Sequence, residues 1–205
     1  MQTDSVSFGA IPINSIIIKK YNKASEKFAD YPVNFVKLDA DNKDDLEAVN
    51  KIVHKWNGAK YIRRIATSAH WMKEKPIEIY ALTSQSQNFE KLQSNYILGL
   101  AEMREDRYDS ENTLLRYLQV RPGAMNVNQK HRINYKYIGS AILKSLKPIY
   151  DNISLFADSN ENIEAFYKHN GFIEDFKGAK HYSWSNNVFK RFCLRIRKFR
   201  LETGI

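Results

Sequence analysis

The stretch SNENIEAFYKHNGF, residues 159–172, places a phenol inside the signals of a short, capped helix. Polar N-cap candidates begin it, and the closing Asn-Gly can supply the left-handed residue that ends a helix. Ile163, Phe166, Tyr167 and Asn170 are spaced i, i+3, i+4 and i+7, which is one helical stripe. Tyr167 is therefore either a packing residue whose hydroxyl reaches water or a donor of a proton.

A carboxylate within an apolar segment is the second candidate for chemistry. In YILGLAEMRED, residues 96–106, strand alternation places Leu98, Leu100, Glu102 and Arg104 on one face. Because carboxylates are uncommon in a core, Glu102 is a candidate functional residue. The alternative is an exposed or ion-paired carboxylate, and Glu105 is the reserve candidate.

A third candidate is the start of the helix predicted over residues 135–150, YKYIGSAILKSLKPIY. A helix begins with backbone N–H groups that lack intrahelical partners and with a positive dipole end, and both suit a phosphate. The N–H groups of Tyr137 to Ala141 can form such a cradle, with Gly139 allowing close approach. Five basic residues surround the segment: Lys130, Arg132, Lys136, Lys144 and Lys147. The alternative is an ordinary helix with solvated lysines.

Composition narrows the class of protein. The chain has 205 residues, which suits one domain, and its 43% hydrophobic content excludes a disordered chain. The net charge of +9 implies attraction to anions such as nucleic acid, a membrane surface or a phosphorylated cofactor. The single cysteine, Cys193, excludes an internal disulfide framework and a zinc finger. We see no signal peptide and no membrane-spanning run, and we expect a cytoplasmic protein.

The elements that must position these residues follow from periodicity. We expect an α/β (α+β) fold, with a central mixed, mostly antiparallel sheet and helices on both faces. Residues 1–32 are expected to be an extension, a poorly determined leader with one apolar piece, SIIIKKY, and 123–134 a polar loop. Strands are predicted over 33–40, 77–83, 95–104, 113–122 and 153–159, and helices over 42–58, 60–74, 135–150 and within 159–172.

Two of these segments together resemble the GNAT superfamily of acyl-CoA-dependent N-acetyltransferases. The strand end Val120-Arg121-Pro122 precedes the helix start NYKYIGSAILKSL, similar to the family's strand, loop Arg/Gln-x-x-Gly-x-Gly/Ala and helix. The later segment SNENIEAFYKHNGF is similar to the family's short helix ending Phe-Tyr-x-x-x-Gly-Phe. The resemblance covers roughly residues 33–185 and is sharpest over 113–172.

The glycine loop departs from the family pattern. Aligning GSAIL with the family's Gly-x-x-Leu-Leu ending puts Gly139 at the second glycine, Tyr137 at the first and Asn134 at the Arg/Gln position. The alternative register, Lys136-x-x-Gly139-x-Ala141, keeps the motif letters but shifts the apolar pattern of the helix. We prefer the first register.

The resemblance implies a function and a set of site residues. It implies direct acetyl transfer from acetyl-CoA to an amine in a ternary complex, with Glu102 as base and Tyr167 as the acid that protonates the leaving thiolate. No covalent intermediate is expected. The residues expected to contact acetyl-CoA are Gln119, Val120, Tyr137, Ile138, Gly139, Ser140, Ala141 and Asn160.

A binding module is the alternative: a GNAT-like fold without turnover that binds nucleic acid or acyl-CoA. The amine acceptor is not specified by the sequence, nucleic acid is a further partner that the basic charge allows, and the chain is expected to be a monomer or homodimer. The five histidines show no close ligand spacing, so we expect no metal. We divide the chain into an extension (1–32), a GNAT-like domain (33–187) and a basic C-terminal tail (188–205), which is another candidate for binding nucleic acid or a partner.

Overall fold

The computed structural model describes residues 9–56, 58–106, 109–122, 134–158, 160–175, 178–188, 190 and 194. The chain divides into two compact units. The first comprises Met1–Glu102 and Tyr117–Ile142, and the second comprises Met103–Arg116 and Leu143–Ile205. Residues 1–8 of the expected extension, residues 123–133 of the expected polar loop, Cys193 and most of the basic tail lie outside the described residues.

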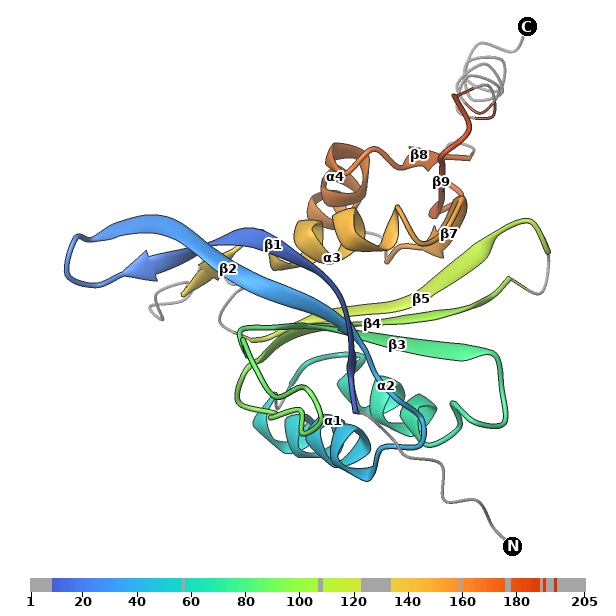
Figure 1. The fold of residues 1–205 in the computed structure, drawn as a ribbon. Helices are drawn as coiled ribbons and strands as arrows, with labels where there is room; N and C mark the ends of the chain where they lie inside the picture. Colours follow the sequence, from blue (N-terminus) through green and yellow to red (C-terminus); the bar gives the residue numbers. More distant parts are fainter. Residues whose placement is uncertain are drawn as a thin grey trace, which may run out of the picture. The chain divides into compact units, whose positions relative to one another are not determined.

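The first unit is built on strands in the order β6-β1-β2-β3-β4-β5. Strand β1 pairs antiparallel with β2 on one side and with β6 on the other. Strand β2 also pairs antiparallel with β3. Figure 1 shows the hairpin of β1 and β2 in blue and the helices α1 and α2 in cyan. The bounds of the elements are β1 Ile11–Asn22, β2 Lys27–Lys37, α1 Lys43–Lys55, α2 Ile62–Ala69, β3 Ile77–Thr83, β4 Ile97–Glu105, β5 Thr113–Val120, β6 Tyr135–Lys136 and α3 Ile138–Leu146.

The second unit is built on the start of β5 and three further strands, in the order β5-β7-β9-β8. The strands β5 and β7 are parallel, whereas β9 pairs antiparallel with both β7 and β8. Strands β4 and β5 and helix α3 each contribute residues to both units. The bounds of the remaining elements are β7 Asn152–Phe156, α4 Glu161–His169, β8 Ile173–Glu174 and β9 His181–Ser185.

The core beneath α1 and α2 explains why these helices form. Asn42 caps α1 by accepting the N–H groups of Asp44 and Asp45, so the acidic turn at 39–45 is a helix cap. The apolar side chains of both helices pack on strand residues in one buried cluster, which includes Val49, Ile52, Ile62, Ile65, Val36, Ile79 and Leu100. Burial of these apolar side chains against the strands stabilises both helices.

The predicted fold class, a mixed and mostly antiparallel sheet with flanking helices, is confirmed. The structure corrects the expectation of a poorly determined leader. Strand β1 and the first part of β2 lie within residues 9–32, and the two strands pair antiparallel from Ile11↔Lys37 to Asn22↔Lys27, with a register shift between Pro12 and Asn14. Periodicity missed this hairpin because its side chains are mostly exposed on both faces. The boundaries at 32 and 187 stay predictions.

Candidate functional site

The start of α3 has the geometry of an anion cradle. The carbonyl of Tyr137 accepts the N–H of Ala141 at 2.8 Å, so the helix begins immediately after Tyr137. The N–H groups of Ile138, Gly139 and Ser140 then have no partner within the helix itself. Tyr137 has a φ of +70°, a left-handed conformation that favours glycine. This is the conformation that a glycine at the first motif position would readily adopt.

Gly99 of β4 is the position against which α3 packs. A Cβ atom there would lie 2.7 Å from Ile142 Cδ1 and 2.9 Å from Ile138 Cγ2, which is closer than real Cβ atoms approach. The same Cβ would lie 3.4 Å from the carbonyl oxygen of Gln119 in β5. A glycine is therefore needed for α3, β4 and β5 to converge at this point. Sequence reasoning did not single out Gly99, although a glycine within a strand signals a close approach.

Gln119 is buried and its side chain has local partners. Its Oε1 accepts the N–H of Tyr61, the residue preceding α2, at 3.3 Å, and its Nε2 donates to the carbonyl of Val120 at 3.0 Å. The side chain therefore fastens the start of α2 to the end of β5. A contact of Gln119 and Val120 with acetyl-CoA stays a prediction.

Glu102 is completely buried in the first unit. The alternative of an exposed carboxylate is therefore wrong, because β4 is covered along Ile97–Met103 and only its last residues approach solvent. Ile97 and Leu100 both pack in the core beneath α1 and α2, although strict alternation places residues three apart on opposite faces. The reserve candidate, Glu105, is exposed.

A cluster of aromatic and basic residues lies near the start of α2 and was not predicted. The rings of Tyr61 and Tyr117 stack with their centroids 5.0 Å apart, and Arg64 donates to the Tyr117 hydroxyl at 3.2 Å. This hydrogen bond is the main cause of a raised pKa for the Arg64 guanidinium. Lys60 lies 5.0 Å from the centroid of the Tyr61 ring. Only the tertiary structure unites these residues, since Tyr117 is far from the others along the chain.

Tyr167 and Asn160 belong to the second unit. The predicted stripe of α4 is half-buried, whereas most of its other residues are exposed. The Tyr167 ring contacts Phe166, Phe172 and Tyr182, with centroids 5.1, 5.8 and 6.1 Å away. Asn160 caps α4 by accepting the N–H of Asn162 at 2.9 Å. Both residues therefore have clear packing or capping roles, and their catalytic and cofactor roles stay predictions.

The basic residues expected around α3 do not act as one group. Lys147 donates to the carbonyl of Asn170 and lies over the rings of Phe172 and Trp184, so it holds the end of α4. Lys136 lies 4.0 Å from the centroid of the Phe28 ring, and Lys144 is exposed on α3. That Lys147 also attracts a phosphate stays a prediction. Lys130 and Arg132 lie outside the described residues.

Comparisons with solved structures identify the fold. No protein-family model matches the sequence, and no curated protein sequence gives a significant match. AtaT complexed with acetyl-methionyl-tRNAfMet matches with a TM-score of 0.50 and 10% identity, over 78% of this chain and 99% of that chain. The fold is that of the GNAT acetyltransferases.

Further solved structures of this kind match with lower scores. AtaTR bound with AcCoA matches at 14% identity over 80% of this chain and 96% of that chain, with a TM-score of 0.49. A GNAT family acetyltransferase from Bacillus cereus matches at 17% identity over 76% of this chain and 98% of that chain, with a TM-score of 0.45.

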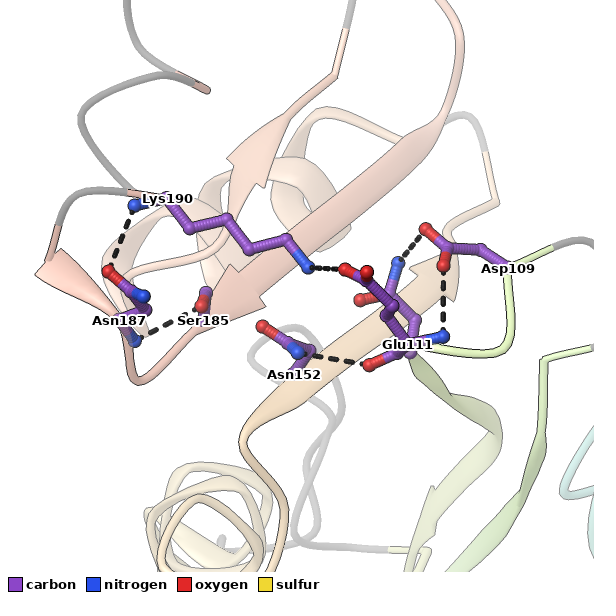
Figure 2. A network of polar contacts seen from close by, with 7 residues as sticks. Asp109, Glu111, Asn152, Ser185, Asn187 and Lys190 are labelled. Atoms are coloured by element: carbon purple, nitrogen blue, oxygen red, sulfur yellow. Dashed lines mark hydrogen bonds and ion pairs between the residues drawn. The ribbon is translucent and has the colours of Figure 1, made fainter.

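Beyond the strands and helices of this GNAT fold, the basic tail begins with an anchored turn (Figure 2). The Asn187 side chain accepts the N–H of Lys190 at 3.2 Å, and the Lys190 ammonium pairs with Glu111 at 3.0 Å. The carbonyl of Glu111 accepts Asn152 Nδ2 at 2.9 Å, which connects the turn to the start of β7. The first residues of the tail therefore belong to the second unit.

Metal-binding groups and membrane-spanning helices are both absent from the described residues. Among the residues that the structure describes, no three His, Cys, Asp or Glu side chains are grouped to hold a metal ion. Within the same residues, every helix is too short or too polar to cross a membrane.

Proposed function

We propose that this chain is an N-acetyltransferase that transfers the acetyl group of acetyl-CoA to an amine by direct attack in a ternary complex. The observation that carries the proposal is the start of α3, where Tyr137 has the glycine-like φ of +70° and three consecutive N–H groups follow. Backbone N–H groups at a helix start and the positive end of the helix dipole suit a pyrophosphate.

The side chains around this start fit a phosphate group. Gly139 is buried in the first turn and carries no side chain to shield the N–H groups. The Tyr137 side chain is 62% exposed, so its ring extends into solvent. Ile138 and Ala141 are buried, so they hold the first turn of α3 against the core. In this proposal the backbone of residues 138–140 binds the pyrophosphate of coenzyme A, and Gln119 and Val120 contact its acyl-bearing arm.

The proposed chemistry needs one base and one acid. The neutral amine attacks the acetyl carbon, the carbon–sulfur bond breaks, and the electron pair leaves on the coenzyme A thiolate. Glu102 accepts the proton of the amine, through water because the carboxylate is completely buried. Tyr167 supplies a proton to the thiolate. The shared fold with AtaT, solved with an acetylated tRNA, supports an acyl acceptor that carries an amine.

A binding module without turnover is the second candidate. The observation favouring it is Tyr137, since a large side chain stands at a position where the related motif has glycine. If its ring covers the N–H groups when ligand arrives, binding of acetyl-CoA is impaired.

Calorimetric titration of acetyl-CoA separates these candidates. We expect the parent chain to bind and Gly139→Val to lose binding, because a β-branched side chain at the cradle pushes the phosphate outward. The control is Ala29→Val, a comparable enlargement at an exposed position of β2. Release of coenzyme A is then followed with a panel of amines.

Three outcomes are decisive. Binding together with coenzyme A release that depends on an amine supports the enzyme. No binding by the parent at millimolar acetyl-CoA, with binding by Tyr137→Gly, supports the blocked module. Equal binding by Gly139→Val and the parent contradicts the cradle.

A further inference from the structure

The hairpin of β1 and β2 extends beyond the sheet on which α1 and α2 pack. The two strands pair along their full length up to Asn22↔Lys27, whereas β3 pairs only with Asn34–Lys37 of β2. In the described part of the chain, the short strand β6 pairs with β1 at Lys19 and Lys20. The projecting ribbon is visible in Figure 1 as the blue hairpin with β6 beside it. We call residues 19–31 with 135–136 the ribbon.

One face of the ribbon combines aromatic rings with lysines. Tyr21 and Phe28 are directly opposite each other, with ring centroids 5.4 Å apart. The Lys136 ammonium lies 4.0 Å from the centroid of the Phe28 ring. Lys19 and Lys136 are direct cross-strand partners on this face. Asp30, the cross-strand partner of Lys19 on β2, pairs with its ammonium at 2.7 Å, so Lys136 is the cation of this pair that is left over a ring.

The other face repeats this combination with different residues. The Lys20 ammonium lies 4.4 Å from the centroid of the Tyr31 ring and 5.8 Å from that of Tyr135. The two tyrosine rings are 5.9 Å apart. Each face of the ribbon therefore presents two aromatic rings, with a lysine ammonium over Phe28 on the first face and over both tyrosines on the second.

The charge of the ribbon is positive. Its five lysines exceed its two acids, Glu26 and Asp30, and Asp30 is already paired with Lys19 at 2.7 Å. The tip residues Lys23 and Lys27 are exposed. The turn between them is ordered by Asn22, whose side chain accepts the N–H of Ala24 at 2.9 Å. The tip thus presents two ammonium groups on a defined backbone.

We propose that the ribbon binds single-stranded nucleic acid. Unpaired bases stack on aromatic rings, and lysines neutralise the flanking phosphates. The four rings of the ribbon are half-buried, so part of each ring reaches the surface. The lysines that lie over rings are already placed where the phosphates next to a stacked base would be. A duplex offers its phosphates but hides its base faces, so the rings favour unpaired bases. The ribbon adjoins the start of α3 through residues 135–136. The proposal does not depend on the acetyl-transfer function, because the variants that test it change residues 21–28.

Fluorescence anisotropy with a labelled oligouridine of about 12 nucleotides tests this surface, since single-strand sites span about 4 to 16 nucleotides. The double charge reversal Lys23→Glu, Lys27→Glu should weaken binding about tenfold or more and make the dependence on salt shallower. The control is Lys43→Glu with Lys51→Glu, which makes the same change of net charge at exposed positions of α1 and should weaken binding much less.

A second pair of variants tests the rings. Tyr21→Leu with Phe28→Leu should weaken binding to the single strand about tenfold while leaving the salt dependence unchanged, because stacking involves no counterion release. Trp71→Leu is the control, since Trp71 is 44% exposed on another part of the first unit. Circular dichroism checks that each variant folds.

The outcomes separate the proposal from its rivals. Equal losses in the tip and α1 reversals would mean that binding follows net charge only and would overturn the proposal. Duplex binding as tight as single-strand binding, unaffected by loss of the rings, would also overturn it. Oligothymidine in place of oligouridine shows whether the strand is read as RNA or as any single strand, and preference for either supports the surface. Acetyl-CoA titration in the same variants should be unchanged.

Discussion

The carbonyl of Tyr137 begins helix α3 by accepting the N–H of Ala141 at 2.8 Å, while Tyr137 itself has a φ of +70°. The first hydrogen bond of the helix is thus set by a residue in a conformation that costs a non-glycine residue about 1–2 kcal/mol. The strain is located at the proposed phosphate cradle, where it keeps the following N–H groups directed along the helix start.

Replacing Tyr137 separates the effect of its backbone from that of its ring. Tyr137→Gly should be more stable than Tyr137→Ala by about 1 kcal/mol, because glycine adopts positive φ freely whereas alanine keeps the strain. Acetyl-CoA affinity should be preserved or tightened in the glycine variant. Thermal unfolding and calorimetry measure the two effects. An alanine variant as stable as the glycine variant would show that φ is not strained.

Gly99→Ala should displace the start of α3, because the new methyl group on β4 would press against this helix. The new Cβ would lie 2.7 Å from Ile142 Cδ1, so the variant should lose about 1–3 kcal/mol of stability and bind acetyl-CoA more weakly. Adding Ile142→Val removes the Cδ1 atom and should restore part of both losses. A double-mutant cycle measures the coupling. Additive effects would show that the two residues do not compete for the same space.

Glu102→Gln tests the proposed base with an isosteric side chain. Turnover should fall about 10²-fold, and the rise of activity with pH should disappear, because the amide cannot accept the proton. Glu105→Gln, at an exposed position, is the matched control. A pH–rate profile of both variants decides, and a rising limb retained in Glu102→Gln would remove this role.

Tyr167→Phe tests the proposed acid. The ring contacts with Phe172 and Tyr182 should be kept, so the fold and coenzyme affinity should not change, whereas turnover should fall about 10²-fold if chemistry is rate-limiting. Tyr182→Phe is the matched control, since the phenol of Tyr182 is buried and burial is the main cause of its pKa being raised to about 12. Unchanged turnover in Tyr167→Phe would leave Tyr167 a packing residue.

The raised pKa of the Asp45 carboxyl predicts how the free energy of unfolding depends on pH. Burial is the main cause that raises the pKa of this carboxyl from 3.8 to about 7. The folded chain therefore binds the proton more tightly than the unfolded chain, so the contribution of Asp45 to stability is present below about pH 4, falls as pH rises to 7 and is constant above that.

The variant Asp45→Asn removes this titration. Its amide oxygen can still accept the N–H of Asp39, which Asp45 Oδ2 accepts at 2.8 Å. The variant should be more stable than the parent at pH 8, by on the order of 1–3 kcal/mol, and similar at pH 4. Urea unfolding across this range measures the difference. A difference that does not change with pH would show that the Asp45 pKa is ordinary in the folded chain.

Local signals in the sequence determined the four helices and the caps of two of them, although α2 and α3 are shorter than the predicted 60–74 and 135–150. The caps of α1 and α4 use side chains within three residues of the helix start, Asn42 and Asn160, and Gly171 ends α4 with a φ of +80°. Such hydrogen bonds and dihedral preferences depend on neighbours along the chain, so they can be predicted from it. The core strands β3, β4 and β5 were predicted for the same reason, since their apolar runs are continuous.

The long-range arrangement was decided only by the tertiary structure. The pairing of β1 with β2 and with β6 joins Lys19 to Asp30 and to Lys136, which are far apart along the chain, and no local pattern specifies such partners. The burial of Glu102 depends on what covers both faces of β4, and the role of Lys147 depends on the end of α4. Tyr137 illustrates the division most clearly. Its place before a helix can be predicted from the sequence, whereas its φ of +70° is known only from the three-dimensional structure. Tertiary packing can hold a non-glycine residue in such a conformation because packing energy can exceed a strain of about 1–2 kcal/mol.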